Sequence, residues 1–465
     1  MASIVVCGGS VVGLSVAMLL ARDGHQVTVL ERDPAPPPAE TSDAWDHWPR
    51  HGVAQFHQPH NLLPRFRLIL DEELPGMVDR LVDAGCVWLD WLSVMPPLIR
   101  DRTPREGDDR FRFVTGRRPV VEAVLAAAAA QEDGVEVRRG VAVTGLRTKP
   151  GVIDGVPHVT GVRTTDGEEL DAGLVVDAMG RRTKLAEWLQ AVGGEAPHVE
   201  SEDCGFVYHT RYFRGPELPA LNGPPVCDIG TISLLTLPGD SGTWSVTVWA
   251  AASDTALRSL RHPDRFTDVV RACPLQAHWV DGEPITDVLT TAGVLDRYRR
   301  FVVDEQPVAT GVAAVGDSWA CTNPSAGRGM TVGLRHAQCL RNVIRSDFGD
   351  PEGFVREWDR VTEAEVAPFY WSQISADRAR IAQMDALRRG EEPPAPDPTA
   401  AAIAAATMRD PDVFRGVLEA GTCLALPDEV FSRPSFMEKV QVHARARMWK
   451  IPGPDRPTLL GLVGP

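Results

Sequence analysis

A segment two-thirds of the way along the chain combines an acid, a proline and glycines in a pattern suited to holding a flat cofactor. It reads GDSWACTNPSAGRGM from Gly316 to Met330, directly after the apolar run 312–315. The run predicts a buried strand, so the Asp317 carboxylate stands at its end, where it can accept hydrogen bonds from sugar hydroxyls. Glycines let backbone N–H groups approach a ring, and a helix that begins near Met330 favours negative charge there. This predicts a flavin seat with the cofactor-binding residues Asp317, Pro324, Gly327, Arg328, Gly329 and Met330. Taken alone, the segment is more typical of a glycine-rich connection into a surface helix.

The amino-terminal segment has the pattern of a dinucleotide-binding turn. The apolar run 4–7 precedes GGSVVG, a helical segment follows over 14–22, and a second apolar run over 26–30 ends at Glu31. Strand, glycine-rich turn, helix, strand and acid follow one another as in a Rossmann unit, and the acid stands about 20 residues after the turn, as a ribose-binding acid should. Serine replaces the second glycine of the fingerprint and could add a hydroxyl contact to the pyrophosphate. The predicted cofactor-binding residues are Gly8, Gly9, Ser10, Val11, Val12, Gly13, Glu31 and Arg32.

The acid at the end of the second strand also narrows the choice of dinucleotide. Glu31 favours a free 2′-hydroxyl, hence FAD or NAD rather than NADP. An NAD dehydrogenase would continue with further strand–helix repeats, whereas this chain continues into the proline-rich stretch 34–38. Together with the seat downstream, this indicates one FAD held by two segments far apart in sequence.

The elements between and after these two segments change in character. The stretches 206–214 and 243–251 alternate with period two and predict an antiparallel sheet inserted between the cofactor segments. Its aromatic residues Tyr208, Tyr212 and Trp249 are candidates for a substrate pocket, although an aromatic core explains them at least as well. Apolar spacing over 61–85 predicts one helix, 346–390 is mostly helical, and 399–451 carries further helical signals.

These motifs resemble those of the class A FAD-dependent monooxygenases, the para-hydroxybenzoate hydroxylase superfamily. The family pattern GD…PxxGxGxN is matched in order and spacing, except that Thr331 replaces the final Asn. An R-x-G-V segment and an R-x-x-L-E-like segment place Arg50 and Arg118 where the resemblance implies contact with FAD, and Gln55 follows the first of them. In the DG motif, Met179 stands where the family has an Asp. The resemblance extends over about residues 1–340, and the tail is loosely like the epoxidase branch.

The resemblance implies an α/β fold of a defined organisation. We expect a Rossmann-like FAD-binding domain of the GR2 type over 1–200 and 301–345, an inserted, mostly antiparallel β-sheet substrate domain over 201–300, and a C-terminal helical region over 346–465. His57 and His60 are candidates for catalytic proton transfer beside the flavin. A structural role for these histidines stays open, and no carboxylate or cysteine lies at ligand spacing to make them a metal site.

Composition excludes several classes of partner. The chain has 465 residues and a net charge of −15, without a long basic run, so nucleic acid is not expected as a partner. We find no apolar stretch of about 18 residues and no basic start of a signal peptide, and we expect no transmembrane segment. The eight cysteines are scattered, without CxxC or zinc spacing. They predict buried, reduced thiols, no metal and a cytoplasmic location.

The resemblance also implies an activity: oxygen insertion from O2 into a small hydrophobic or aromatic substrate, by hydroxylation or epoxidation, through a flavin C4a-hydroperoxide. Other flavin chemistry, such as double-bond reduction or halogenation, and a non-catalytic flavin-binding role remain the alternatives. NAD(P)H is the expected electron donor, since only one dinucleotide fingerprint is present and most single-chain relatives are reduced directly. A separate flavin reductase is the second source of electrons that the pattern allows.

Overall fold

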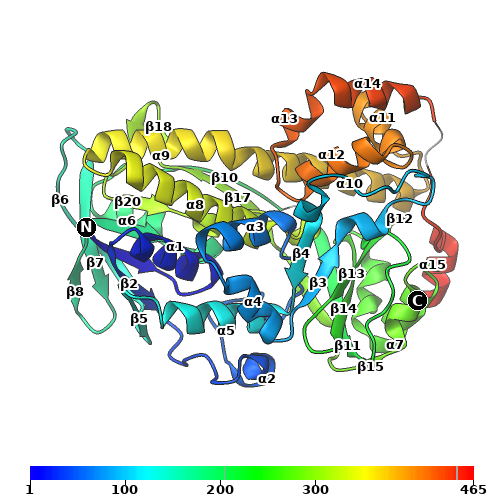
Figure 1. The fold of residues 1–465 in the computed structure, drawn as a ribbon, viewed down its shortest axis with the longest axis horizontal. Helices are drawn as coiled ribbons and strands as arrows, with labels where there is room; N and C mark the ends of the chain where they lie inside the picture. Colours follow the sequence, from blue (N-terminus) through cyan, green and yellow to red (C-terminus); the bar gives the residue numbers. More distant parts are fainter. Residues whose placement is uncertain (204, 447–448, 465) are drawn as a thin grey trace.

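A five-stranded parallel sheet forms the core of the part drawn at left in Figure 1. The computed structural model describes residues 1–203, 205–446 and 449–464, and Cys204 lies outside them. The sheet has the order β20-β9-β1-β2-β5. Its strands are β1 (Ser3–Cys7), β2 (Gln26–Glu31), β5 (Val135–Arg139), β9 (Leu174–Asp177) and β20 (Val312–Ala314).

The strand register explains how segments 300 residues apart reach one place. Cys7 at the end of β1 lies beside Leu30 of β2 and Asp177 of β9, and Ala314 of β20 lies beside the same Asp177. Because all the strands are parallel, their carboxyl ends share one edge, which is where open α/β sheets bind ligands. The amino-terminal glycine turn and the segment that contains Asp317 both leave the sheet at this edge.

Helices pack on the parallel sheet and on one another. α1 (Val11–Arg22) packs against α5 (Arg118–Ala129) and α8 (Gly329–Asp347), and their apolar faces belong to one large core. Leu14, Leu20, Leu125 and Leu340 in these helices have at most 1% of their surface exposed. The strand–turn–helix order predicted at the amino terminus is confirmed.

The single helix predicted over 61–85 is wrong. The segment forms two helices, α3 (Pro64–Glu73) and α4 (Met77–Asp83). Between them stands Pro75, which has no N–H to donate, and then Gly76, whose φ of +82° is the left-handed conformation that glycine adopts without strain. Both helices still bury the apolar residues that the spacing predicted, since Phe66, Leu70 and Leu81 are all buried.

The predicted antiparallel sheet is confirmed and forms the lower right part of Figure 1. Its order is β12-β13-β14-β11-β15, with β16 also paired to β11. One face packs on α7 (Pro263–Arg271) and α15 (Arg456–Val463), with Trp244, Val246 and Val248 in that core. Successive side chains of a strand point to opposite faces, so the alternate residues of these strands face the parallel-sheet half. The strands are β11 (Phe206–Arg214), β12 (Val226–Ile229), β13 (Ile232–Pro238), β14 (Thr243–Ala251), β15 (Glu283–Pro284) and β16 (Leu289–Ala292).

The carboxyl-terminal region is helical, as predicted. α9 (Pro351–Glu365) and α10 (Ala367–Arg389) lie along the first core, and a small bundle, at upper right in Figure 1, follows them. The bundle has its own core around Val413, Val430 and Val440 and consists of α11 (Pro398–Thr407), α12 (Pro411–Gly421), α13 (Pro427–Phe431) and α14 (Pro434–His443). Over the described residues, none of the helices is both long and apolar enough to cross a membrane.

Smaller elements complete the fold. β10 (His198–Asp203), β17 (Leu295–Arg300) and β21 (Ala320–Cys321) form a three-stranded sheet, and β17 carries the buried acid Asp296. The other elements are α2 (Ala44–His47), α6 (Leu185–Ala191), β3 (Val87–Asp90), β4 (Arg112–Thr115), β6 (Val143–Pro150), β7 (Pro157–Thr164), β8 (Glu169–Asp171), β18 (Val302–Val303) and β19 (Gln306–Pro307).

Candidate cofactor and substrate site

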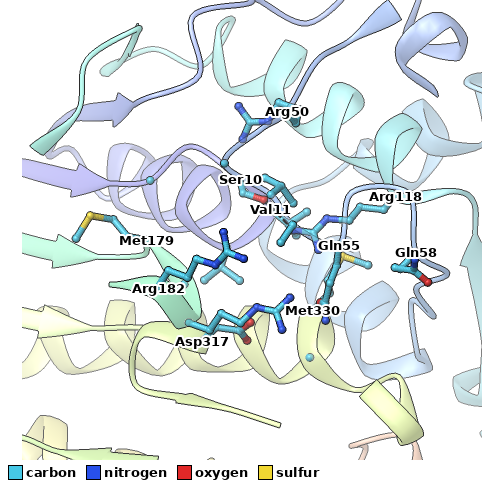
Figure 2. A pocket seen from close by; sticks show the side chains of 18 of the residues that line it. Ser10, Val11, Arg50, Gln55, Gln58, Arg118, Met179, Arg182, Asp317 and Met330 are labelled. Carbon is cyan, nitrogen blue, oxygen red and sulfur yellow. Dashed lines mark hydrogen bonds between the residues drawn. The ribbon is translucent and has the colours of Figure 1, made fainter. Parts of the chain in front are cut away.

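A cavity of about 620 Å³ runs from the carboxyl edge of the parallel sheet to the antiparallel sheet. Figure 2 shows Ser10 and Val11 of the amino-terminal turn on one side of it and Asp317 and Met330 of the downstream segment on the other. The structure therefore brings the two predicted cofactor segments together around one space. The predicted residues that line it are Gly8, Gly9, Ser10, Val11, Val12, Glu31, Arg32, Arg50, Gln55, Arg118, Asp317, Pro324, Gly327, Gly329 and Met330.

Two of the predicted cofactor-binding residues, Gly13 and Arg328, are not part of this lining. A Cβ on Gly13 would lie 1.9 Å from the Gly8 oxygen, so this glycine allows the turn to close on its own helix. Arg328 lines a separate cavity of about 30 Å³ and donates to the Ser372 hydroxyl at 3.1 Å. Gly13 therefore shapes the turn, and Arg328 ties the downstream segment to α10.

The glycines of both segments sit where a side chain would collide or would block the cavity. Gly8 has a φ of +108°, and a Cβ there would lie 2.5 Å from the Ala178 oxygen. A Cβ on Gly333 would lie 2.5 Å from Val12 Cγ2, so α8 and α1 approach closely and hold the two segments in register. At Gly329 a Cβ would meet no heavy atom within 4 Å, which leaves the α8 N-terminus open toward the cavity.

A buried network of ion pairs underlies the amino-terminal turn. Arg50 Nη2 lies 3.0 Å from Glu31 Oε2 and 2.9 Å from Glu122 Oε1, and its side chain is fully buried. The Glu31 carboxylate also accepts from the Gly9 N–H at 2.9 Å, so the predicted ribose acid holds the turn itself. Burial opposes the charge on Arg50, but Glu122 and Glu31 outweigh it and raise its pKa. Sequence reasoning missed Glu122. Its position as the one acid in the apolar stretch 119–129 is a signal, because a buried carboxylate needs a positively charged partner.

The serine that replaces a fingerprint glycine belongs to the same network. Ser10 Oγ donates to Glu122 Oε2 at 2.7 Å and accepts from Arg118 Nη2 at 3.1 Å. A second nitrogen of Arg118, Nη1, lies 2.9 Å from His60 Nε2. The substitution thus connects the first turn to α5, in addition to any contact with a ligand.

His60 lines the cavity but is poorly suited to be a base. Its Nδ1 lies 2.8 Å from the Gln58 carbonyl, so Nδ1 carries the proton and Nε2 accepts from Arg118. Burial and the Arg118 charge lower the His60 pKa to about 3. His57 is not among the cavity-lining residues and instead bonds the Trp45 carbonyl at 3.1 Å. Neither histidine therefore supports the predicted role in proton transfer.

The acid of the downstream segment is held in place by its neighbours. The Gly316 N–H donates to His336 Nδ1 at 3.1 Å, and His336 Nε2 bonds the Thr362 hydroxyl at 3.1 Å. The His336 ring stacks on Trp358 at 4.5 Å, and burial lowers its pKa to about 3, so it is a neutral support. Burial raises the pKa of Asp317 against the opposing charges of arginines around it. A hydrogen bond from a ligand hydroxyl would favour its charged form.

The turn after β9 contains a buried acid two residues before Met179. Asp177 Oδ1 accepts from the Met179 N–H at 2.9 Å and from the Ser318 hydroxyl at 3.0 Å, and its Oδ2 accepts from the Thr183 hydroxyl. Burial raises the pKa of Asp177. Although Met179 replaces the family's acid, the turn still contains a carboxylate, because Asp177 joins the turn to the segment around Ser318.

The end of the cavity beside β5 is lined by residues 141–144, which sequence reasoning missed. Residues 141–144 follow β5 at the carboxyl edge of the sheet, next to β2, and their place could have been predicted from strand order. The cavity is also lined by Arg181, Arg182, Lys184 and the ring of Trp188, and Arg182 points into it in Figure 2. These basic side chains and this ring suit a phosphate-bearing, ring-containing ligand.

The opposite end of the cavity is formed by one face of the antiparallel sheet. Tyr208 and Trp249 are directly opposite in register and stack at 5.8 Å. Thr210, Thr247, Leu235 and Thr291 complete the sheet's share of the lining, and among the described residues none of this share is charged. Two of the three aromatic candidates thus lie in the cavity.

Tyr212 is the candidate that does not line the cavity. It shares a face of β11 with Tyr208, but it lies further along the strand and is covered by Trp45, with ring centres 4.7 Å apart. Next to it, Arg117 Nη2 pairs with Asp240 Oδ2 at 2.7 Å, and both side chains are nearly fully buried. This ion pair joins the segment before α5 to the turn between β13 and β14.

The residues present fit an FAD. Arg50 Nε and Nη1 are buried without a hydrogen-bond partner, although the guanidinium lies beside the cavity at the first turn. Buried donors of this kind cost stability unless a ligand satisfies them, and a diphosphate is an acceptor of suitable charge. The flavin end of the cofactor would be contacted by the open N-terminus of α8, by Asp317 and by the glycine-rich loop.

Comparisons with known proteins agree with this arrangement. Residues 3–92 match the DAO family of FAD dependent oxidoreductases. Protein Rv3254 of Mycobacterium tuberculosis is 27% identical over 398 residues, which cover 80% of this chain and 79% of that protein. PqsL, a probable FAD-dependent monooxygenase from Pseudomonas aeruginosa, superimposes with a TM-score of 0.60 at 16% identity, over 83% of this chain and 99% of PqsL. The myxobacterial halogenase CndH superimposes with a TM-score of 0.60 at 18% identity, over 95% of this chain and 96% of CndH.

Proposed function

We propose that this chain, an FAD-dependent oxidoreductase with the fold of class A monooxygenases and halogenases, is a monooxygenase that inserts one oxygen atom of O2 into a small, largely apolar substrate. One observation carries the proposal. A single cavity connects the two predicted cofactor segments with an uncharged sheet face that holds Tyr208 and Trp249. The substrate would bind at that face, next to the reactive ring of the cofactor.

Each part of the cofactor has a set of residues to hold it. Glu31, Arg32 and residues 141–144 would contact the adenosine, and Arg50 and the first glycine turn would bind the diphosphate. Asp317 would accept from the ribityl hydroxyls, and the loop before Gly329 would contact the ring. When bound, FAD would supply the two-electron chemistry that activates O2.

The chain's own contribution is then to position substrate and exclude water. The stacked pair Tyr208 and Trp249 offers a flat apolar wall. The Tyr208 hydroxyl donates to Asn323 Oδ1, so its oxygen would be available to the substrate as a hydrogen-bond acceptor. Exclusion of water would favour oxygen transfer over loss of the oxidant as hydrogen peroxide.

Oxygen uptake tests the proposal. The FAD-loaded, reduced protein is mixed with buffer saturated with 18O2 in place of air, with and without a panel of neutral aromatic and alkene compounds. We expect one 18O atom in the product and less hydrogen peroxide when a substrate is present. Products that carry no 18O would reject monooxygenation, and bromide- or chloride-dependent products would favour halogenation instead.

Electron supply is a separate part of the proposal. We propose direct reduction by NAD(P)H, with Arg181 or Arg182 meeting a phosphate, because both line the cavity near the cofactor segments. Anaerobic mixing of the FAD-loaded protein with NADH or NADPH should bleach the flavin absorbance within minutes. If only dithionite bleaches it, a separate flavin reductase becomes the better hypothesis.

The seven described cysteines are free and buried, which supports a reducing compartment such as the cytoplasm.

A further inference from the structure

Asn323 lies at the junction of three parts of the chain, directly before the predicted flavin loop 324–329. It lines the cavity, and only 1% of its surface is exposed. Its side-chain Oδ1 accepts from the Tyr208 hydroxyl at 2.5 Å, and its Nδ2 donates to Asp377 Oδ2 at 3.3 Å. Its backbone N–H donates to Asp296 Oδ1 at 2.5 Å. One residue thus contacts the antiparallel sheet and helix α10 through its side-chain amide, and strand β17 through its backbone N–H.

Helix α10 also holds the loop itself. Ser325 Oγ donates to Asp377 Oδ1 at 2.6 Å, and Gln373 Nε2 donates to Asp377 Oδ2 at 2.9 Å. Gln373 and Asp377 are 4% and 5% exposed, so the contacts are shielded from water. A carboxylate that accepts three hydrogen bonds in such a place fixes the groups around it more firmly than a surface contact would.

These contacts place the flavin loop under the control of elements outside the parallel sheet. Tyr208 belongs to the wall proposed for the substrate, and Asp377 belongs to the carboxyl-terminal helices. Asn323 is in contact with both. A displacement of the Tyr208 hydroxyl would therefore change the hydrogen bonding of Asn323 and, through it, of the loop that begins at Pro324.

We propose that Asn323 is a positioning residue that couples the substrate wall to the flavin loop, with Tyr208 and Asp377 as the groups it joins. The inference rests on the proposed function, since it takes the loop to be the flavin seat. Coupling between two side chains that share a partner shows itself as non-additive effects of their substitution.

A double-mutant cycle tests this proposal. Tyr208→Phe, Asp377→Asn and the double variant are compared with the wild type in their dissociation constants for FAD and in urea unfolding of the FAD-free chain. We expect Asp377→Asn to weaken FAD binding by about 10-fold, as loss of a charge-assisted hydrogen bond does. The double variant should differ from the product of the single effects by about threefold or more, and the difference should vanish when Asn323→Ala is added.

Tyr212→Phe provides the matched control, since Tyr212 lies on the same face of β11 but outside the cavity. Combined with Asp377→Asn, it should give FAD dissociation constants that multiply within about twofold. If Asp377→Asn does not fold, Ser325→Ala removes the contact from the loop side and should give the same coupling to Tyr208→Phe.

The outcomes separate this inference from the function it rests on. A wild-type chain that binds no FAD would overturn both. FAD binding by the wild type with additive effects of Tyr208→Phe and Asp377→Asn would overturn the coupling alone. Coupling seen in urea unfolding but absent from every FAD dissociation constant would reduce Asn323 to a purely structural residue and would also reject the proposal.

Discussion

The two ends of the cavity are built on different principles. At the amino-terminal turn, Arg50, Glu31 and Glu122 form a buried charged network whose atoms approach within 3.0 Å. At the antiparallel sheet, Tyr208 and Trp249 present a stacked apolar surface to the same space. The first end holds charged side chains and the backbone of the turn in fixed positions, and the second presents an apolar surface of defined shape.

This difference suits the two ligands that we propose. A dinucleotide carries fixed negative charge, so it can be bound by fixed positive charge, backbone N–H groups and helix N-termini. A small apolar substrate offers mainly surface, and its affinity depends on the fit of the wall. We therefore expect substitutions at the charged end to change FAD binding and stability strongly, and substitutions at the sheet to change selectivity with smaller effects on both.

The largest effect is expected from Glu122→Ala. The change removes the 2.9 Å partner of a fully buried arginine and leaves Glu31 as its remaining close partner, and breaking a buried ion pair costs about 3–5 kcal/mol of unfolding free energy. Urea unfolding of the FAD-free chain measures it. Glu132→Ala is the matched control, since its 3.0 Å pair with Arg22 is partly exposed and should be worth less than about 1 kcal/mol. Equal losses for the two variants would contradict the role given to the buried network.

Gly13→Ala should remove most FAD binding. The added Cβ would lie 1.9 Å from the Gly8 oxygen, so the first turn must shift away from the diphosphate. We expect FAD affinity to fall at least about 100-fold, which corresponds to about 2.7 kcal/mol. Gly145→Ala, where a Cβ meets no heavy atom within 4 Å, should leave the affinity unchanged. A Gly13→Ala chain that binds FAD as well as the wild type would show that the turn does not shape the site.

Asp317→Ala should weaken FAD binding by about 10- to 100-fold. The carboxylate would lose a charge-assisted hydrogen bond worth about 1.5–3 kcal/mol. His57→Ala serves as the control, because His57 is not among the residues that line the cavity. Fluorescence titration with FAD measures both variants, and an unchanged dissociation constant for Asp317→Ala would reject the assignment of the ribityl contact.

A pH-dependent effect is expected between the two ends, at Asp296. Burial first, and then the nearby carboxylates of Asp377, Glu202 and Asp203, raise the pKa of Asp296 to about 6, against the opposing Asn323 N–H. A carboxyl whose pKa is higher in the folded than in the unfolded chain lowers stability as pH rises between the two values. Asp296→Asn should therefore gain stability relative to the wild type from pH 4 to 6, by about 1–3 kcal/mol, and the gain should level off above. Urea unfolding at several pH values measures this, and a gain that is independent of pH would contradict it.

The smallest effect is expected at the sheet wall. Thr210 and Thr247 share a hydrogen bond of 2.9 Å between their hydroxyls. Thr210→Val removes it and should cost about 0.5–1.5 kcal/mol of unfolding free energy while FAD affinity stays within about twofold. A tenfold loss of FAD affinity would show that the wall belongs to the cofactor site after all.

The same contrast explains what the sequence could predict. The strands, both cofactor segments and Glu31 follow local rules of periodicity and turn chemistry, and these elements are found as expected. The break at Gly76 was missed because the apolar spacing continues across it. The place of Tyr212 depends on Trp45 from a distant segment, and the three contacts of Asn323 come from residues that spacing does not connect. Such contacts are set by tertiary packing, which a single sequence does not encode in any local pattern.

Equilibrium titration of the FAD-free chain with FAD tests the central claim most directly. We predict one FAD per chain, bound noncovalently, with the flavin absorbance bands resolved by transfer to a less polar site. Asp317→Ala should lower the affinity through the flavin end and Glu31→Ala through the adenosine end. A chain that stays colourless after incubation with excess FAD, while its unfolding transition shows it to be folded, would contradict the account.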